Sequence, residues 1–179
     1  LYVGLVTIAQ KRLDQMLGYS SVMHMGYIFL GIASANAVGL SGASLLLFAH
    51  GLSIAALFAL CGHLRSLKPG LALDGFGGLG RTSPFLGAVF GLAAFASIGL
   101  PGFANFASEM LVFFGAFKPS APSTQTLQFQ IATGCATWGV VISAVYMLRA
   151  YRSVFLGPVR TPDTEETRTW AAAALTNLR

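Results

Sequence analysis

The stretch ASIGLPGFANFASEMLVFFGAF, residues 96–117, joins two apolar runs of half length, Pro84–Ile98 and Phe103–Phe117. Three residues that disrupt helices separate the runs: Gly99, Pro101 and Gly102. Proline lacks an N–H and clashes with the preceding turn, and glycine lets the backbone leave helical geometry. The stretch therefore predicts a structural helix break at these three residues. Its second half carries a carboxylate, Glu109, in otherwise apolar surroundings.

The composition around this stretch is that of a membrane protein. The 179 residues are 55% hydrophobic and 9% charged, with a mean hydropathy of +0.69, whereas soluble domains carry about 25% charged residues. The apolar runs are long enough to cross a bilayer as helices, and the two-residue alternation of a membrane barrel is missing. The sequence thus predicts an all-α fold, a polytopic transmembrane helix bundle with one discontinuous helix.

Three further apolar runs are simple spans: Met16–Ala35, Ala43–Leu67 and Leu127–Leu156. The run Leu1–Ala9 is about half the length that a span needs, and no initiator Met precedes it. We interpret the chain as a fragment cut inside a helix, and we expect the information for membrane insertion to lie upstream.

The basic residues indicate how the broken segment crosses the membrane. A single crossing would place all of the 11 Lys and Arg residues on one side except Lys118. Two crossings would divide them almost evenly, which the positive-inside rule disfavours. We therefore predict one discontinuous helix, with the loop 65–83 and the C-terminal tail on the cytoplasmic side.

The arrangement of apolar spans and polar tail also predicts that the chain has two parts. Residues 1–157 form a membrane domain that is truncated at its N-terminus. Residues 158–179 form a cytoplasmic amphipathic segment, in which Thr161 and Pro162 are typical of the N-cap and first position of a helix.

Only one acidic residue, Glu109, and two histidines, His24 and His50, fall inside the spans. An ionised group at mid-membrane costs ~2.5–3.5 kcal/mol on insertion scales, and such groups tend to face the bundle interior and to be functional. Burial favours the neutral, proton-carrying form of a carboxyl group. The alternative is that Glu109 caps the second half-helix, but with Asn105 as N-cap it falls one place beyond the capping-box position.

Each histidine lies on a face with other polar or small residues. The helical spacing puts five residues on the His24 face: Ser20, His24, Tyr27, Gly31 and Ser34. For His50 the same spacing adds Ser53, and Gly42 and Gly51 would allow close helix approach. Either histidine alone could be a packing residue, but with a carboxylate in the same bundle we favour a proton relay made of Glu109, His50 and His24.

Other chemistry has little support in the sequence. Residues 75–80 match a dinucleotide pattern, but no strand precedes them. The cysteines, Cys61 and Cys135, lie in apolar runs, and no Cys/His spacing fits zinc. We expect no cofactor and no metal in this chain, and no nucleic acid as a partner.

Five ordered blocks carry a family resemblance: YSSVMHMG (19–26), AHGLSIAALFALCG (49–62), FGGLG (76–80), ASIGLPGFANFASEMLVFFGAF (96–117) and YMLRAYRSVFLGP (146–158). With them the chain resembles the antiporter-like membrane subunits of respiratory complex I, a family of proton-conducting membrane transporters. Within it the chain is most similar to the chain M group, whose mitochondrial counterpart is subunit 4, and it corresponds to a piece of the C-terminal half.

The resemblance implies a function and a set of roles. In that family a mid-membrane line of Lys, His and Glu joined by water carries protons, and its last member lies on a broken helix. Glu109 matches that position, His50 the central relay and His24 an auxiliary one. The Lys and Glu residues on the intake side would lie upstream of Leu1. A Glu rather than a Lys at position 109 is typical of chain M.

The resemblance further implies a proton-translocating subunit of NADH-quinone oxidoreductase, an enzyme whose redox centres lie in other chains. The expected partners are the antiporter-like neighbours L and N and the lipid bilayer, in a bacterial cytoplasmic (inner) membrane. Three alternatives stay open: a subunit of a multisubunit sodium/proton (Mrp-type) antiporter, a subunit of a membrane-bound hydrogenase or formate hydrogenlyase, and a packing subunit that conducts nothing.

Overall fold

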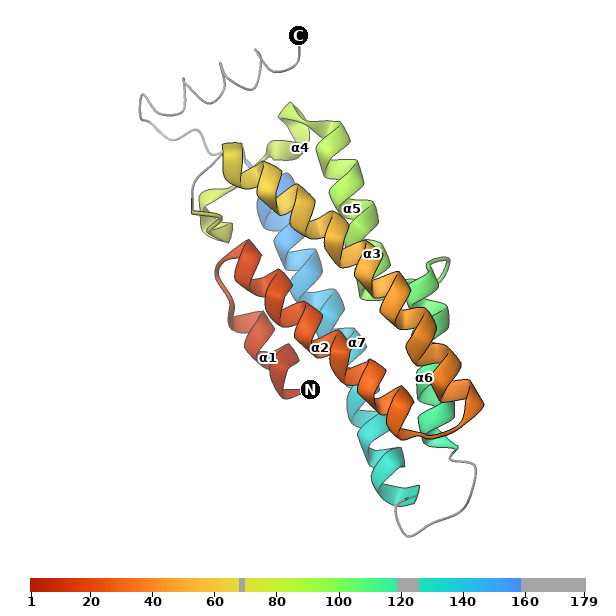
Figure 1. Ribbon diagram of the computed structural model, residues 1–179. Coiled ribbons are helices and arrows are strands. Elements are labelled where there is room, and N and C mark those ends of the chain that lie inside the picture. The colour runs from red at the N-terminus through yellow and green to blue at the C-terminus, as the bar shows by residue number, and fades with distance from the viewer. Residues whose placement is uncertain (68–69, 119–125, 159–179) are drawn as a thin grey trace.

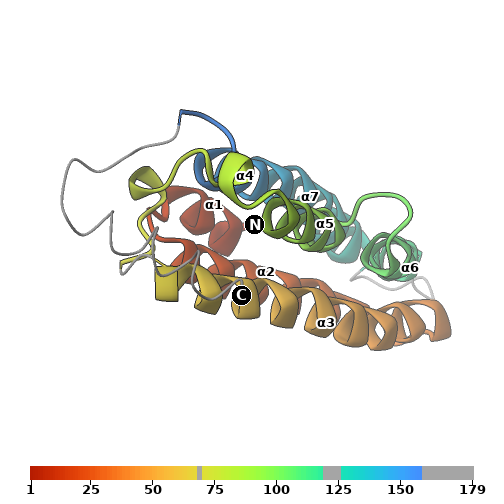
Figure 2. The same ribbon diagram turned by 90° about the horizontal axis from the view of Figure 1, so that it is seen from above.

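The computed structural model describes residues 1–67, 70–118 and 126–158, and within them the chain is a bundle of helices without a β-strand. The elements run α1 (Tyr2–Ala9), α2 (Leu13–Ala33), α3 (Ala37–Leu67), a 3₁₀ turn η1 (Leu73–Gly75), α4 (Leu79–Thr82), α5 (Pro84–Ile98), α6 (Ala104–Phe117) and α7 (Thr126–Phe155). Figure 2 shows α2 and α3 side by side, with α5 and α7 packed over them. The expected amphipathic segment 158–179 lies outside the described residues, apart from Pro158.

Three helices, α2, α3 and α7, are long and apolar enough to cross a membrane, and α5 and α6 are shorter apolar helices. The first three correspond to the three simple spans of the sequence. The helix α3 begins before its apolar run, because the Oδ1 atom of Asn36 accepts a hydrogen bond of 2.9 Å from the N–H of Gly39 and caps the helix.

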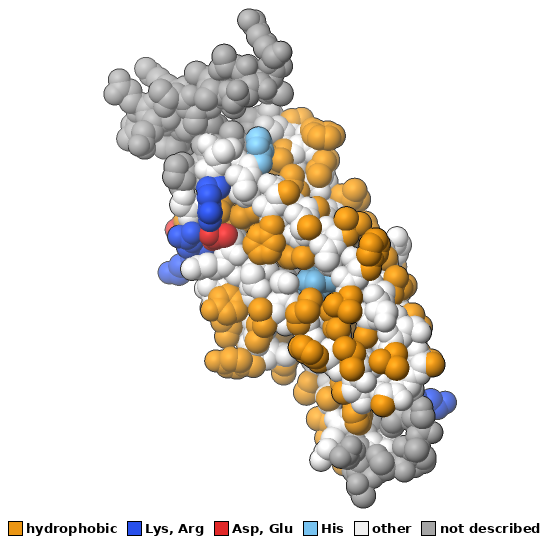
Figure 3. Space-filling view, viewed as in Figure 1, with side chains coloured by type: hydrophobic (Ala, Val, Ile, Leu, Met, Phe, Trp, Pro, Cys, Tyr) orange, Lys and Arg blue, Asp and Glu red, His pale blue; other side chains and the backbone are white. Residues whose placement is uncertain are grey.

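The broken segment traverses the bundle once (Figure 1), as expected for one discontinuous helix. In Figure 1, α5 begins at the end of the bundle where α3 finishes, and α6 ends beside the turn between α2 and α3. Lys118 follows α6 at that end. The other described basic side chains are concentrated near the opposite end (Figure 3).

The break itself is a glycine-terminated helix end. Gly99 adopts φ +78°, which is the left-handed region that glycine enters at little cost. The N–H of Gly99 bonds the carbonyl of Ala96, and the N–H of Leu100 bonds that of Phe95 at 3.2 Å. This is the Schellman pattern, and a proline commonly follows it because it cannot continue the helix. Here that residue is Pro101.

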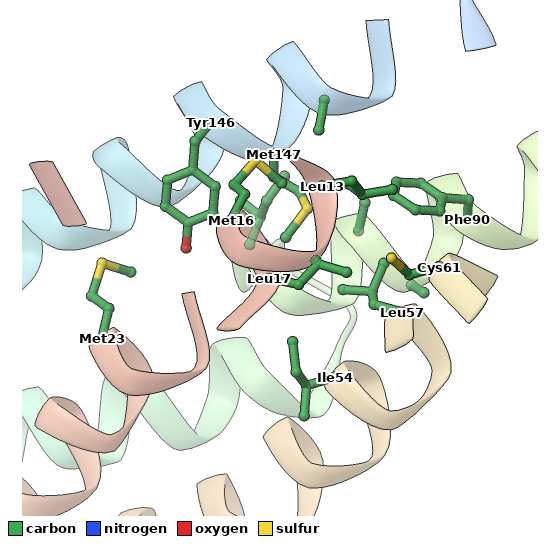
Figure 4. Close-up of a cluster of buried hydrophobic side chains, with 14 of the residues drawn as sticks. Leu13, Met16, Leu17, Met23, Ile54, Leu57, Cys61, Phe90, Tyr146 and Met147 are labelled. Carbon is green, nitrogen blue, oxygen red and sulfur yellow. The ribbon is translucent and has the colours of Figure 1, made fainter. Parts of the chain in front are cut away.

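Many large hydrophobic side chains lie on the surface of the bundle. Phe48 is 74% exposed, Phe85 81% and Trp138 66%, and hydrophobic side chains cover the flank shown in Figure 3. A contiguous apolar surface of this extent marks an interaction with lipid or protein. Beneath it, α2, α3, α5 and α7 contribute a buried cluster that includes Leu17, Leu57, Phe90 and Met147 (Figure 4).

Glycines let the helices approach closely at several points. A Cβ at Gly42 would lie 2.6 Å from the backbone N of Val112, and Gly115 faces the backbone of Gly39. The prediction that Gly42 permits close packing is confirmed, so α6 lies directly against α3. Within the described residues Gly51 does not do so, because it is exposed and no described atom lies within 4 Å of its Cβ position.

Polar contacts tie the charged end of the bundle together. Asp14 Oδ2 accepts hydrogen bonds of 2.7 Å from both Arg12 and Arg65, which joins the start of α2 to the end of α3. The guanidinium of Arg149 donates to the carbonyls of Ile8 (2.5 Å) and Gln10 (2.7 Å). These two bonds satisfy carbonyls at the C-terminal end of α1, which the helix cannot satisfy itself.

Candidate functional site

The three ionisable residues predicted as a relay come from three helices and lie together in the bundle interior. His24 is in the middle of α2, His50 in the middle of α3, and Glu109 in α6 just beyond the break. Their exposed fractions are 1%, 0% and 1%. The fold therefore removes all three from the lipid-facing surface, as expected for intramembrane ionisable groups.

His24 is the imidazole next to the carboxyl group. Its Nε2 atom lies 3.8 Å from Oε1 of Glu109. This separation is too long for a hydrogen bond but within the range of an ion pair, and in a buried site the attraction between opposite charges is stronger than in water. A movement of about 1 Å would bring the two atoms to the distance of a charge-assisted hydrogen bond.

His50 lies on the other side of His24. The two imidazole rings are stacked, with centroids 4.5 Å apart and planes inclined by 13°. The Nε2 atom of His50 lies 3.2 Å from the hydroxyl of Ser21. The described contacts thus place His24 between His50 and Glu109, whereas the resemblance gave His50 the central role; the roles themselves stay predictions.

The ring of His24 is held by two main-chain carbonyls. Its Nδ1 atom lies 2.8 Å from the carbonyl oxygen of Ser20, one turn earlier on α2. Its Nε2 atom lies 3.1 Å from the carbonyl oxygen of Ser97, near the end of α5. The break in the discontinuous helix therefore contacts His24 directly, through a backbone atom.

Further polar side chains extend this cluster. The hydroxyls of Ser20 and Tyr146 are 2.6 Å apart and both residues are fully buried. Beyond His50, the hydroxyl of Ser53 donates to the carbonyl of His50 (3.1 Å), and Asn105 donates to Ser53 (3.4 Å). Polar residues from α2, α3, α6 and α7 thus surround the three ionisable groups.

Gly99 leaves room for the carboxyl group of Glu109. A Cβ built at Gly99 would lie 2.5 Å from Oε2 and 3.0 Å from Cδ of Glu109. Any other residue would add a Cβ there, so the side chain of Glu109 packs against the bare backbone of the break. The three residues predicted to break the helix therefore do more than interrupt it, because one of them borders the carboxylate.

The capping explanation of Glu109 does not fit the structure. The helix α6 begins at Ala104 with Phe103 as its N-cap residue, and no side chain caps it. The expectation that Asn105 is the N-cap is therefore wrong, because Asn105 already lies within the helix. Glu109 lies more than one turn from the start of α6, where the influence of the helix dipole has faded.

Four buried polar atoms around the cluster have no protein hydrogen-bond partner among the described residues: Tyr27 Oη, His50 Nδ1, Ser97 Oγ and Glu109 Oε1. Buried polar atoms usually have a partner, either protein or water. Gly139 on α7 faces the hydroxyl of Tyr27, so the backbone of α7 lies directly against that oxygen. In the described ranges, no group of three or more His, Cys, Asp or Glu residues is arranged to hold a metal ion.

Sequence reasoning missed two parts of this site, the carbonyl of Ser97 and the pair formed by Ser20 and Tyr146. A signal for the first is present in the sequence. In a helix the carbonyl of Ser97 would accept the N–H of residue 101, and that residue is a proline. The second has no such local signal, because the two residues are 126 positions apart.

Comparisons with known proteins agree with this architecture. The family model described as NADH:quinone oxidoreductase/Mrp antiporter, transmembrane, matches residues 1–134. NAD(P)H-quinone oxidoreductase chain 4 of Prochlorococcus marinus (strain MIT 9303) is 39% identical over 157 residues, which are 88% of this chain and 28% of that protein. NADH-quinone oxidoreductase subunit M of Rickettsia conorii is 36% identical over 163 residues, 91% of this chain and 31% of that protein.

A solved structure extends the likeness to three dimensions. A chain of respiratory complex I from Thermus thermophilus with bound NADH superposes with a TM-score of 0.80 at 29% identity, over 99% of this chain and 37% of that chain. The chain spans less than a third of the length of the two curated relatives. The family match, the identities and the superposition together show that the chain belongs to the NADH:quinone oxidoreductase/Mrp antiporter family of membrane proteins.

Proposed function

We propose that the chain is part of a proton-translocating membrane subunit of an NADH-quinone oxidoreductase, in which quinone is reduced elsewhere in the complex. The curated relatives carry names of that class of enzyme. We expect no redox centre in this chain. The antiporter-like chains L and N of such a complex are the proposed neighbours, in a bacterial inner membrane.

One observation carries the proposal: a carboxyl group and two imidazoles lie buried in contact at a break in a membrane helix. Non-helical backbone at membrane depth is tolerated where protein or a water-filled cavity satisfies it. Broken helices often mark transport sites. Because each intramembrane ionisable group is costly, a cluster of three with one carboxyl is better explained by proton transfer than by packing.

The proposed mechanism is a change of protonation along the cluster. A positive charge that arrives at His50 repels a proton on the stacked ring of His24, 4.5 Å away. That proton moves to Glu109, whose Oε1 atom faces Nε2 of His24 at 3.8 Å. Glu109 then releases a proton through water at the break, toward the side where Lys118 lies.

The orientation follows from the charges. The end of the bundle that carries Arg12, Arg65, Arg81 and Arg152 is the cytoplasmic end in this proposal, because cytoplasmic loops are rich in Lys and Arg. The loop 65–83 is then cytoplasmic, and protons leave on the opposite side.

A second candidate is a subunit of a cation/proton antiporter without a redox partner, which the description of the matched family also names. The cluster would then exchange H⁺ against Na⁺. A Na⁺ gradient imposed across vesicles distinguishes the two. An antiporter acidifies or alkalises the lumen without NADH, and the oxidoreductase subunit does not.

The test is Glu109→Gln in the intact complex, measured in inverted membrane vesicles. Glutamine keeps the shape of the side chain but carries no transferable proton, and loss of a positioned acid or base typically costs ~10²–10⁴-fold in rate. We expect protons pumped per second to fall by about 10²-fold. The matched control, Asp14→Asn, removes a carboxylate at the charged end and should pump normally. Unchanged pumping in Glu109→Gln would refute the proposal.

A further inference from the structure

We propose that the main-chain carbonyl of Ser97, which the break leaves without a donor from its own helix, is a proton-positioning group that holds the transferable proton on His24 Nε2 rather than on Glu109. The inference rests on the proposed function for its purpose. Its geometry is independent of that function, because it concerns where a proton resides in the resting chain. Ser97 acts through His24 and is a positioning residue.

The backbone hydrogen bonds at the break leave the carbonyl of Ser97 without a donor from its own helix. In an unbroken helix the carbonyl of Ser97 would accept the N–H four residues on, and Pro101 has none. The N–H groups of Gly99 and Leu100 donate to the carbonyls of Ala96 and Phe95, respectively. A buried carbonyl needs a partner, and the atom that reaches it is Nε2 of His24, at 3.1 Å.

Whether His24 can donate to both of the carbonyls that flank it depends on how many protons its ring carries. Carbonyl oxygens only accept hydrogen bonds, and a neutral imidazole has a single N–H to donate. A neutral ring can therefore bond Ser20 (2.8 Å) or Ser97 (3.1 Å), and its other nitrogen then presents a lone pair to an oxygen. Only the doubly protonated ring donates to both carbonyls at once.

Among the described residues, the charge of that ring has one candidate counter-ion, Glu109. The titratable groups around His24 are His50 from α3, Glu109 from α6, Tyr27 from its own helix at 5.5 Å between ring centroids, and Tyr146 of α7 through Ser20. The helix α5 brings no titratable side chain. Of these groups only Glu109 has a reference pKa on the acidic side of neutrality, so it is the one candidate counter-ion among them.

The resulting step moves one proton and no electrons between the two groups. In the proposed resting pair the attraction between opposite charges outweighs the burial that favours neutral groups, so His24 is an imidazolium and Glu109 a carboxylate. Transfer breaks the Nε2–H bond and forms the Oε1–H bond, which leaves two neutral groups and a lone pair on Nε2. The carbonyl of Ser97 loses its donor in that step, so it biases the proton toward His24 until charge at His50 overcomes the bias.

The test compares two proline substitutions in the full-length chain within its complex, with ¹⁵N-labelled histidine observed by NMR. Pro101→Ala removes the proline that prevents the helix from continuing past Gly99, and it supplies the N–H that the carbonyl of Ser97 would accept in a continuous helix. The matched control, Pro84→Ala, replaces the proline at the first position of α5, where an N–H has no helical partner. His24→Asn and His50→Asn assign the ring signals.

We expect doubly protonated ring signals for His24 in the parent and in Pro84→Ala at neutral pH. In Pro101→Ala the ratio of charged to neutral His24 should fall by about tenfold, which corresponds to ~1.4 kcal/mol. An unchanged ratio in Pro101→Ala, or a neutral His24 in the parent, would overturn the inference. A charged His24 in the parent that responds to Pro101→Ala, together with normal pumping by Glu109→Gln, would keep the inference and refute the proposed function.

A second measurement covers the case in which Pro101→Ala does not assemble. Serine labelled with ¹³C at the carbonyl gives an isotope-shifted infrared band for each serine, and the band lost in Ser97→Ala identifies residue 97. In His24→Phe, which has no ring donor, this band should shift to the higher frequency of a carbonyl without that bond. A band that does not move would show that His24 does not donate to Ser97, and the inference would fail.

Discussion

Replacing Gly99 by alanine should displace the carboxyl group of Glu109 without touching either residue of the proposed proton transfer. The added Cβ would lie 2.5 Å from Oε2 of Glu109, whereas ordinary contacts begin at 3.4 Å. The carboxylate must therefore withdraw by about 1 Å, and a misplacement of about 1 Å can cost ~10²-fold in rate. Gly99 also has φ +78°, so alanine adds strain of about 1–2 kcal/mol.

Gly102 provides the matched control, because it has the strain without the contact. Its φ is +105° and nothing lies within 4 Å of its Cβ position. Gly102→Ala should lower the free energy of unfolding by a similar ~1–2 kcal/mol. It should leave the carboxylate in place, so the difference between the two variants isolates the displacement.

The assay is proton pumping by inverted vesicles, followed with a pH-sensitive dye and divided by the amount of assembled complex. We expect Gly99→Ala to pump roughly 10–100 times more slowly than Gly102→Ala. Equal pumping by the two variants would show that the position of the carboxylate at the break does not matter. Equal and severe losses in both would instead attribute the effect to backbone strain.

Two further predictions concern packing and the charged end. Gly115→Ala places a Cβ against the backbone of Gly39 and should lower the free energy of unfolding in detergent by about 1–3 kcal/mol. Gly134→Ala, with no described atom within 4 Å of its Cβ position, should leave the free energy of unfolding unchanged. Equal losses in the two variants would contradict the close contact of α6 and α3. Asp14→Asn removes the acceptor shared with Arg65 but should cost at most ~1 kcal/mol, because the partners are exposed. Thermal unfolding at low and high salt would measure it, and a loss that grows with salt would be inconsistent with a surface ion pair.

The fold was predictable because its signals are local or additive. Apolar runs of sufficient length predicted α2, α3 and α7, and the pattern Gly99-Leu100-Pro101-Gly102 predicted the break. The distribution of basic residues, which is a property of the whole chain, decided between one crossing and two. The start of α3 was not predicted, because a single hydrogen bond from Asn36 extends that helix beyond its apolar run.

The structure brings together the three ionisable residues that the sequence singled out, but their order was not predictable. The sequence singles out Glu109, His24 and His50 because placing an ionisable side chain at mid-membrane has a high free energy. Which imidazole lies beside the carboxyl depends on how α2, α3 and α6 rotate about their axes, and the mean pattern of apolar residues leaves that angle free. Gly51 shows the same limit, because its small size permits close packing but its face points outward.

The contact between His24 and Ser97 has a consequence for how this region can change in evolution. The acceptor is a main-chain oxygen, so any residue at position 97 that keeps the backbone in place preserves it. Such substitutions at position 97 leave the contact with the imidazole unchanged. Position 101, four residues away, matters more to the contact, because any residue other than proline there would carry an N–H that a continued helix could direct at the same carbonyl.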